Sequence, residues 1–201
     1  MRNHTVGVDP ALIERCQAGD LSAFETIFDC FRQPVYSLAV TIVKDSALAE
    51  DVVQETFLAV FQKIDAFRGQ ARFETWLIAI AVNQCRLILR RQRLRQFFSL
   101  DSLTGGWLLR LSGNVENPAD TVAQQHQADL LWQLADQLDE RLRLPLFLHY
   151  RYDYTGAEIA RILGSNPNRV YQQLYEGRQQ LRRLLQAETA FDQGRERGDK
   201  S

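Results

Sequence analysis

The chain has 201 residues, of which 45% are hydrophobic and 24% are charged, and its formal net charge is −1. This length suits one or two small domains with a buried core, and the composition argues against a largely disordered chain. A net charge near zero says little about a partner, so any binding surface must be recognised from local charge.

Neither cysteine nor histidine spacing indicates a metal or redox centre. Cys16, Cys30 and Cys85 are far apart and lie in apolar patterns, so we expect reduced core residues of a cytoplasmic protein. The three histidines lack metal-ligand spacing, and we expect no metal or other cofactor. The polar N-terminus has no signal-peptide pattern. The longest apolar run, residues 76–82, is far shorter than the roughly 18 residues that span a membrane.

The first part of the chain has helical signals. Asp9-Pro10 predicts an N-cap followed by a first-turn proline, and Gly19 predicts the end of that helix. Ser22 and Glu25 have the spacing of a capping box, which predicts the start of a second helix. Apolar residues then recur at helical spacing, and we expect Pro34 to break or kink this run.

A third helix is predicted over about residues 47–64. Its expected core stripe consists of Val53, Phe57, Val60 and Ile64. Its other side is polar and mostly acidic, with Glu50, Asp51, Gln54, Glu55 and Gln62. By itself, this stripe indicates no more than a solvated helix face.

Residues 66–98 combine an aromatic loop with a cationic helix that begins near Thr75. Phe67, Phe73 and Trp76 cluster around Gly69, and no acidic residue occurs between Thr75 and Leu100. Aromatic faces stack unpaired bases at about 1–3 kcal/mol per base, amides bond to base edges and arginines follow the backbone. The amides at hand are Gln70 and Asn83, and the cationic track is Arg86, Arg90, Arg91, Arg93 and Arg95.

A structural alternative exists for each part of this stretch. The three aromatic residues could simply close the core, and for Trp76 we favour that interpretation. Phe67 and Gln70 stand beside a glycine in a loop, which favours a functional role for both. The arginines could also form a solvated face.

The helical pattern lapses between residues 99 and 125. Gly105-Gly106, Gly113-Asn114 and Asn117-Pro118 are typical of a linker, although it contains the apolar segment Trp107–Leu111. We therefore predict an all-α fold with two small helical domains, residues 1–98 and 126–190, joined by a flexible linker at 99–125. The polar tail, residues 191–201, is expected to be disordered.

The second domain contains a helix-turn-helix pattern. A capping box at residues 155–158 begins a short helix, Gly164 ends it, and Asn166-Pro167 begins the next. Ala160 allows close approach of the two helices, and the β-branched Val170 fills the space between them. In this geometry the second helix enters the DNA major groove, although a plain helical corner would have similar signals. Pro145 falls in the preceding helix and is expected to remove a hydrogen bond or shift its start.

The second helix of this motif has a polar, modestly charged face. Glutamine can pair with adenine and arginine with guanine, and an asparagine near the helix start can bind phosphate. A solvated face would look similar. The positions expected to be exposed are Asn168, Arg169, Tyr171, Gln172, Gln173, Tyr175, Glu176 and Arg178.

Two long stretches resemble extracytoplasmic-function (group IV) sigma factors of bacterial RNA polymerase. The stretch "AEDVVQETFLAVFQKIDAFRGQARFETWLIAIAVNQCRLILRR", residues 49–91, resembles their region 2. The stretch "NPADTVAQQHQADLLWQLADQLDERLRLPLFLHYRYDYTGAEIARILGSNPNRVYQQLYEGRQQLRRLL", residues 117–185, resembles the end of their linker and region 4. The resemblance covers about residues 10–186.

The resemblance implies three interfaces. The third helix would dock on the β′ clamp helices of core polymerase through Asp51, Gln54, Glu55, Leu58 and Gln62. The non-template −10 strand, with one base flipped into the loop around Gly69, would contact Phe67, Arg68, Gln70 and Asn83. The aromatic and cationic pattern of the sequence itself adds Phe73, Arg86, Arg90 and Arg91 to this surface. Duplex −35 DNA would contact Tyr171, Gln172, Gln173 and Tyr175, and the expected exposed face of the helix adds Asn168, Arg169 and Arg178.

The resemblance thus implies a non-enzymatic promoter-specificity subunit in the bacterial cytoplasm. Its partners would be core polymerase (β′ clamp helices and β flap), promoter DNA and an anti-sigma factor, without membrane insertion. An autonomous helix-turn-helix regulator is a rival, but it needs neither the aromatic loop nor the acidic helix. An all-α enzyme lacks support, because the sequence has no metal spacing, phosphate loop or catalytic triad grouping.

Overall fold

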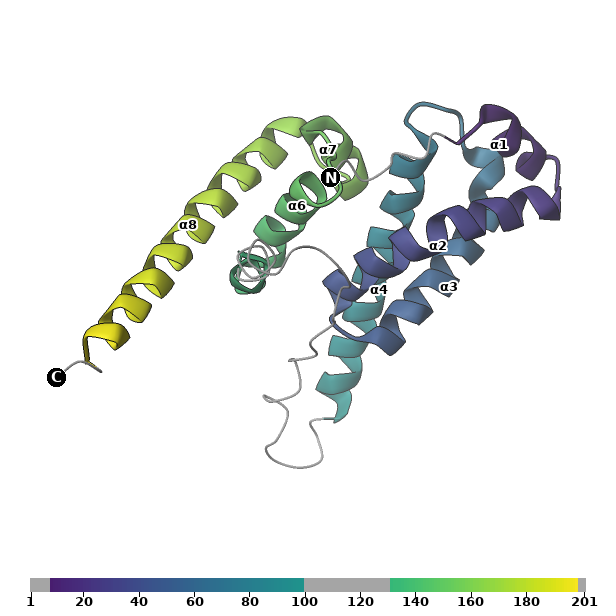
Figure 1. Ribbon diagram of the computed structural model, residues 1–201. Coiled ribbons are helices and arrows are strands. Elements are labelled where there is room, and N and C mark those ends of the chain that lie inside the picture. The colour runs from purple at the N-terminus through teal and green to yellow at the C-terminus, as the bar shows by residue number, and fades with distance from the viewer. Residues whose placement is uncertain (1–7, 100–130, 199–201) are drawn as a thin grey trace. The chain divides into compact units, whose positions relative to one another are not determined.

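The computed structural model describes residues 8–99 and 131–198, and every regular element in these two ranges is helical (Figure 1). The helices fall into two groups, one in each range, which confirms the prediction of an all-α fold with two helical domains. Apart from Ser99, the predicted linker lies outside the described residues, and so does its apolar segment Trp107–Leu111.

The N-terminal group is a helical bundle. It consists of α1 (Pro10–Gln17), α2 (Leu21–Val43), α3 (Ser46–Lys63), the 3-10 turn η1 (Ile64–Ala66) and α4 (Phe73–Ser99). Helices α2, α3 and α4 pack against one another, and the short α1 contacts both α2 and η1 (Figure 1). The centre of the bundle is apolar, with completely buried side chains from each long helix, including Ile27, Leu38, Val52, Val60, Leu77 and Val82.

The first two helix starts differ in how well the sequence predicted them. Asp9 caps α1 as expected, because its carboxylate accepts a hydrogen bond from the Ala11 amide at 3.0 Å. Gly19, with φ of +84°, follows the end of α1 as expected. The predicted capping box at Ser22 is wrong, since α2 begins at Leu21 and its N-cap is Asp20.

Pro34 does not break α2. The helix continues from Leu21 to Val43 with the proline inside it. Val35, Leu38 and Ile42 after the proline are buried like Ile27 and Phe31 before it. Burial of this shared apolar face outweighs the hydrogen bond that a proline removes.

The C-terminal group is smaller. It begins with a helical turn over residues 131–135 and continues with α6 (Glu140–Tyr150), α7 (Gly156–Leu163) and α8 (Pro167–Gly198). Helix α6 packs along α8 (Figure 1). Gly177 permits this approach, because a Cβ atom there would lie 2.7 Å from Cδ1 of Leu146. Pro145 is buried within α6, which starts at Glu140 and continues to Tyr150.

The predicted turn signals of α7 and α8 are confirmed. Thr155 and Glu158 form a capping box, with 2.9 Å from the Thr155 amide to Oε2 of Glu158 and 3.3 Å for the reciprocal bond. Gly164 has φ of +61°, and Asn166 accepts a hydrogen bond from the Arg169 amide at 2.9 Å. Helix α8 extends to Gly198, so the tail that we expected to be disordered is helical over residues 191–198.

Cysteines and membrane spans complete the description. Cys16 and Cys85 are buried as predicted, but Cys30 is exposed, because helical rotation places it beside the buried stripe of Ile27 and Phe31. Within residues 8–99 and 131–198, no helix is both long enough and apolar enough to cross a bilayer. The same ranges contain no cluster of three or more His, Cys, Asp or Glu suited to a metal ion.

Candidate nucleic-acid interface

A tight turn carries the chain from η1 into α4. Phe67 donates its amide hydrogen to the Ile64 carbonyl at 3.0 Å, and Arg68 donates from Nη1 to the Asp65 carbonyl at 2.5 Å. Gly69 follows with φ of +67°, a backbone conformation in which a side chain would be strained. The chain turns here because glycine adopts the left-handed conformation without steric strain. The turn leaves Arg68 and Gln70 exposed.

Three aromatic rings meet at this turn. The Phe67 ring lies 5.4 Å from that of Phe73 at 84° and 5.3 Å from the indole of Trp76 at 51°, measured between centroids. Phe73 also contacts Phe31 at 6.0 Å and is only 5% exposed, whereas Phe67 and Trp76 are half-buried. Phe73 therefore supports the cluster from the core, and Phe67 and Trp76 form its solvent-facing edge.

This burial corrects one predicted contact. We expected Phe73 to touch single-stranded DNA, but a ring with 5% exposure offers no free face for a base. The apolar period of α4 continues through Phe73 to Leu77, which explains why its ring points inward.

The outer face of α4 continues from this aromatic edge. Trp76, Asn83 and Arg90 follow one another at intervals of seven residues, nearly two helical turns, and therefore lie on one face. Asn83 and Arg90 are exposed, and so are Leu87 between them and Arg91 beside them. Arg86 is half-buried and has an interaction partner. The predicted amide and arginine positions thus share one surface with Trp76.

Helix α3 presents a separate surface. Asp51, Glu55, Leu58 and Gln62 are spaced by four, three and four residues, so they form one stripe, and Gln54 flanks it. All five side chains are exposed. Phe61 belongs beside this stripe and was missed from the sequence, although it lies three residues after Leu58. Leu58 is 52% and Phe61 50% exposed, so the stripe is acidic at Asp51 and Glu55 and apolar at Leu58 and Phe61.

The predicted face of α8 is exposed at every position except Gln173. Asn168, Gln172 and Tyr175 recur at spacings of four and three residues and are exposed, opposite the buried Val170 and Leu174. Arg169 and Glu176 are also exposed on the flank of this face. This is the arrangement that a helix needs in order to present side chains to base edges.

Among the other predicted −35 positions, Tyr171 and Arg178 are exposed as expected but also contact neighbouring helices, and Gln173 is half-buried. The Tyr171 ring packs on Gly156, where a Cβ atom would be 2.6 Å from its Cε1 atom. Gln173 is half-buried, and its buried Oε1 atom has no hydrogen-bond partner within the described residues. Arg178 donates to the Leu174 carbonyl at 3.1 Å and to the Tyr150 hydroxyl of α6 at 3.5 Å. Gln173 is thus turned away from the exposed face, whereas Arg178 is exposed and bonds to α6.

An apolar groove of about 410 Å³ runs between α6 and α8. It was not predicted from the sequence, because its walls come from three segments. The apolar side chains that line it are Leu131, Trp132, Ala135, Leu146, Tyr150, Leu181 and Leu185.

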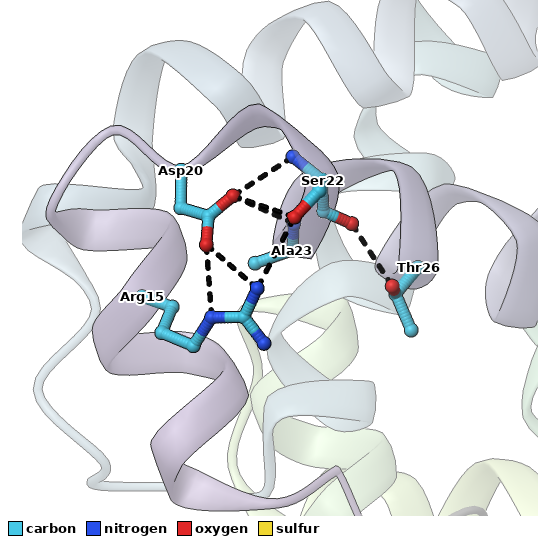
Figure 2. A network of polar contacts seen from close by, with 5 residues as sticks. All are labelled: Arg15, Asp20, Ser22, Ala23 and Thr26. Carbon is cyan, nitrogen blue, oxygen red and sulfur yellow. Dashed lines mark hydrogen bonds and ion pairs between the residues drawn. The ribbon is translucent and has the colours of Figure 1, made fainter.

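A polar network fixes the junction between α1 and α2 (Figure 2). Arg15 donates to Oδ2 of Asp20 from Nε at 2.8 Å and from Nη2 at 2.6 Å, while Ser22 donates its hydroxyl to Oδ1 at 2.8 Å. Hydrogen bonds from Ser22 and Arg15 lower the pKa of Asp20 to about 2. Burial, together with the charge of Asp20, raises the pKa of the neighbouring Cys16 thiol.

The chain matches two known family models. Sigma-70 region 2 matches residues 27–95, and Sigma-70, region 4 matches residues 128–181. The ECF RNA polymerase sigma-E factors of Salmonella typhimurium (strain LT2) and Escherichia coli (strain K12) are each 30% identical over 185 residues. These alignments cover 89% of this chain and 94% of each relative.

Two solved structures share the fold. One is CnrH in complex with the cytosolic domain of CnrY, with a TM-score of 0.63, 21% identity and coverage of 88% of this chain and 96% of that one. The other is the sigma factor RpoE of Bartonella quintana in complex with the anti-sigma factor NepR, with a TM-score of 0.63 and 19% identity. It covers 81% of this chain and 96% of that one.

Proposed function

The chain belongs to the extracytoplasmic-function (ECF) sigma factors of the sigma-70 family, and from that membership we propose which surfaces perform each step of promoter recognition. As a sigma factor it gives bacterial RNA polymerase its promoter specificity at transcription initiation. In the proposal, residues 1–98 dock on core polymerase and capture the −10 element. Residues 126–190 hold the −35 element as duplex, with a linker between the two domains.

The aromatic edge on the loop before α4 is the observation that carries the −10 assignment. Phe67 is half-buried and contacts Trp76, and the neighbouring Gly69 is open to solvent, with no other atom within 4 Å of where its Cβ would lie. Stacking on such a ring contributes about 1–3 kcal/mol per base, which offsets part of the few kcal/mol needed to extrude a base from duplex. We assign capture of one extruded base to Phe67, with Phe73 as its support.

Polar groups around this edge complete the −10 surface. Arg68 and Gln70 are exposed on the loop, where they can bond to phosphate and to a base edge respectively. Asn83 lies two turns beyond Trp76 on the same face of α4 and can bond to a neighbouring base. Arg86, Arg90 and Arg91 then follow the strand backbone, helped by the absence of acidic residues from Thr75 to Leu100.

The stripe on α3 is assigned to core polymerase. Its acids Asp51 and Glu55 precede the exposed Leu58 and Phe61 along the helix, and an interface typically combines such apolar residues with charged ones at its edge. The assigned residues are Asp51, Gln54, Glu55, Leu58 and Gln62, facing the β′ clamp helices. Because α3 leads directly through η1 to the Phe67 loop, docking would bring the base-capturing edge to the DNA at the same time.

The exposed face of α8 is assigned to −35 duplex DNA. Asn168 and Arg169 stand at the helix start, where they can bond to phosphates, and Gln172 and Tyr175 can reach base edges. We assign Tyr171 to bracing α8 against α7 through Gly156. The apolar groove between α6 and α8 is the surface that we assign to the β flap.

Two modest DNA contacts on one tethered chain strengthen each other once polymerase holds both domains. The chain alone should bind promoter duplex weakly, because the aromatic edge has no substrate until the duplex opens. We also propose control by an anti-sigma factor, in view of the structural neighbour bound to NepR, and action in the bacterial cytoplasm, where promoter DNA is found.

A binding comparison tests this assignment. Fluorescently labelled promoter duplex is titrated with the chain alone, with core polymerase alone and with the two together. We expect tight, sequence-dependent binding only for the combination. Tight binding by a dimer of the chain alone would instead indicate an autonomous helix-turn-helix regulator.

A further inference from the structure

The last residue of α1 reaches the loop that carries Phe67. Gln17 is half-buried, and its Nε2 atom donates to the Ile64 carbonyl at 2.9 Å and to the Phe67 carbonyl at 3.1 Å. A side-chain amide nitrogen has two hydrogens, so it can make both bonds at once. One side chain thereby joins the two ends of the turn, from a position 47 and 50 residues away in the sequence.

These bonds fix the backbone that presents the Phe67 ring. The Ile64 carbonyl already accepts the Phe67 amide at 3.0 Å, so the bonds from Gln17 complete a closed set around residues 64–67. Carbonyls at the end of a helical segment have no partner within that segment and otherwise face water. With the Phe67 carbonyl held, the peptide plane that leads into Arg68 and Gly69 cannot rotate freely.

Helix α1 is itself anchored, so Gln17 is a fixed support. At its end Gly19 donates to the Cys16 carbonyl and Asp20 to the Arg15 carbonyl, both at 3.0 Å. Arg15 then binds the carboxylate of Asp20, the N-cap of α2 (Figure 2). The start of α2 thus holds α1 through the ion pair of Asp20 with Arg15, and α1 in turn holds the loop through Gln17. Gln17 precedes residue 27, where the match to region 2 begins.

We propose that Gln17 is a positioning residue for promoter opening, which holds the Ile64 and Phe67 carbonyls so that the Phe67 ring stays oriented for an extruded base. It does not touch the DNA. This inference rests on the proposed role of Phe67 in capturing that base.

The test uses holoenzyme and a single-stranded non-template oligonucleotide that spans the −10 element of a promoter recovered by run-off transcription. Gln17→Met keeps the length of the side chain and removes its donor. Loss of two neutral hydrogen bonds should weaken binding by about tenfold. A series of oligonucleotides, each lacking one base, identifies the captured base. On the oligonucleotide without that base, Gln17→Met and wild type should bind equally well.

Glu14→Gln, an exposed change on the same helix, is the matched control and should bind both oligonucleotides like wild type. Core affinity should be the same for wild type, Gln17→Met and this control. The thermal midpoint of Gln17→Met should fall, because two part-buried carbonyls lose a donor, but the variant should remain folded at the assay temperature. Gln17→Glu is the second variant, because it keeps the size of the side chain and its ionised carboxylate cannot donate.

Several results would overturn the proposal. One is binding of the intact oligonucleotide by Gln17→Met as tightly as by wild type. Another is an equal loss on every base-lacking oligonucleotide, or misfolding of both variants, since either would make Gln17 a folding residue only. Phe67→Ala distinguishes a failure of the role proposed for Phe67 from a failure of the role proposed for Gln17. If it leaves binding unchanged, the role of Phe67 fails, whereas a loss in Phe67→Ala alone refutes only the role of Gln17.

Discussion

The rings of Phe67 and Trp76 lie 5.3 Å apart, centroid to centroid, and neither ring is buried. Phe67 comes from the loop and Trp76 from the first turn of α4, so the pair joins the turn around Gly69 to the face that carries Asn83. Trp76 had the pattern of a core residue, and its half-buried position instead places it beside the proposed base site.

Replacement of Phe67 tests that site. Phe67→Ala should reduce promoter opening by roughly 5- to 150-fold, because stacking contributes about 1–3 kcal/mol per base. Affinity for core polymerase should not change. Permanganate reactivity of −10 thymines measures opening, and competition for core measures affinity.

Phe73→Ala is the contrasting variant. Because Phe73 is buried, its loss should lower the free energy of unfolding by about 3–5 kcal/mol. If Phe67→Ala reduced opening and core binding to the same extent, Phe67 would be a structural residue like Phe73.

Charge reversal on α3 tests the docking surface. Asp51→Lys should weaken core binding by tenfold or more, because reversing a charge inside an electrostatically complementary interface costs several kcal/mol. Asp29→Lys makes the same change in charge at an exposed position of α2 and should have little effect. Equal co-purification of both variants with core polymerase would remove the assignment of α3.

Replacements at two positions of α8 distinguish residues that read DNA from residues that pack against α6. Gln172→Ala should reduce discrimination at one −35 base pair by about 1–3 kcal/mol, because Gln172 is exposed at the centre of the reading face. Arg178→Ala should leave −35 preference unchanged, because Arg178 bonds to Tyr150 on α6. Transcription from a library randomised at −35 measures both effects. A changed base preference in Arg178→Ala would show that it reads DNA.

The junction between α1 and α2 should be acid-sensitive. The pKa of Asp20 is about 2 in the folded chain, below the ordinary value of 3.8, so the folded form binds this proton more weakly than the unfolded one. The resulting stabilisation is complete above about pH 4 and is lost as the pH falls towards 2. Asp20→Asn should lower the thermal midpoint near pH 7, and its difference from wild type should shrink below pH 4. If the difference in thermal midpoint did not depend on pH, the charge of Asp20 would not contribute to stability.

Signals confined to one turn predicted most of the helix boundaries that they were applied to, although the capping box expected at Ser22 was wrong. The capping box at Thr155, the left-handed Gly164 and the cap at Asn166 each involve a side chain and a backbone group a few residues apart. Such contacts are encoded in the spacing of residue types, which is why the helix-turn-helix could be recognised before its structure.

Contacts between distant segments could not be predicted in this way. Gln17 reaches a loop 47 residues away, and Arg178 reaches Tyr150 across 28 residues. Both Phe67 and Phe73 were expected to contact DNA, but the turn between them leaves the Phe67 ring half-buried and buries that of Phe73. Pro34 was expected to break or kink its helix. The helix continues through Pro34, because apolar residues on both sides of the proline pack into the same core.

Run-off transcription on a pool of genomic fragments tests the central claim most directly. Core polymerase is supplied with the purified chain, and the start sites are mapped and aligned. We predict a discrete set of starts that share a −35 and a −10 element, with −10 use lost in Phe67→Ala and −35 preference altered in Gln172→Ala. Starts no more specific than those of core polymerase alone would contradict the account.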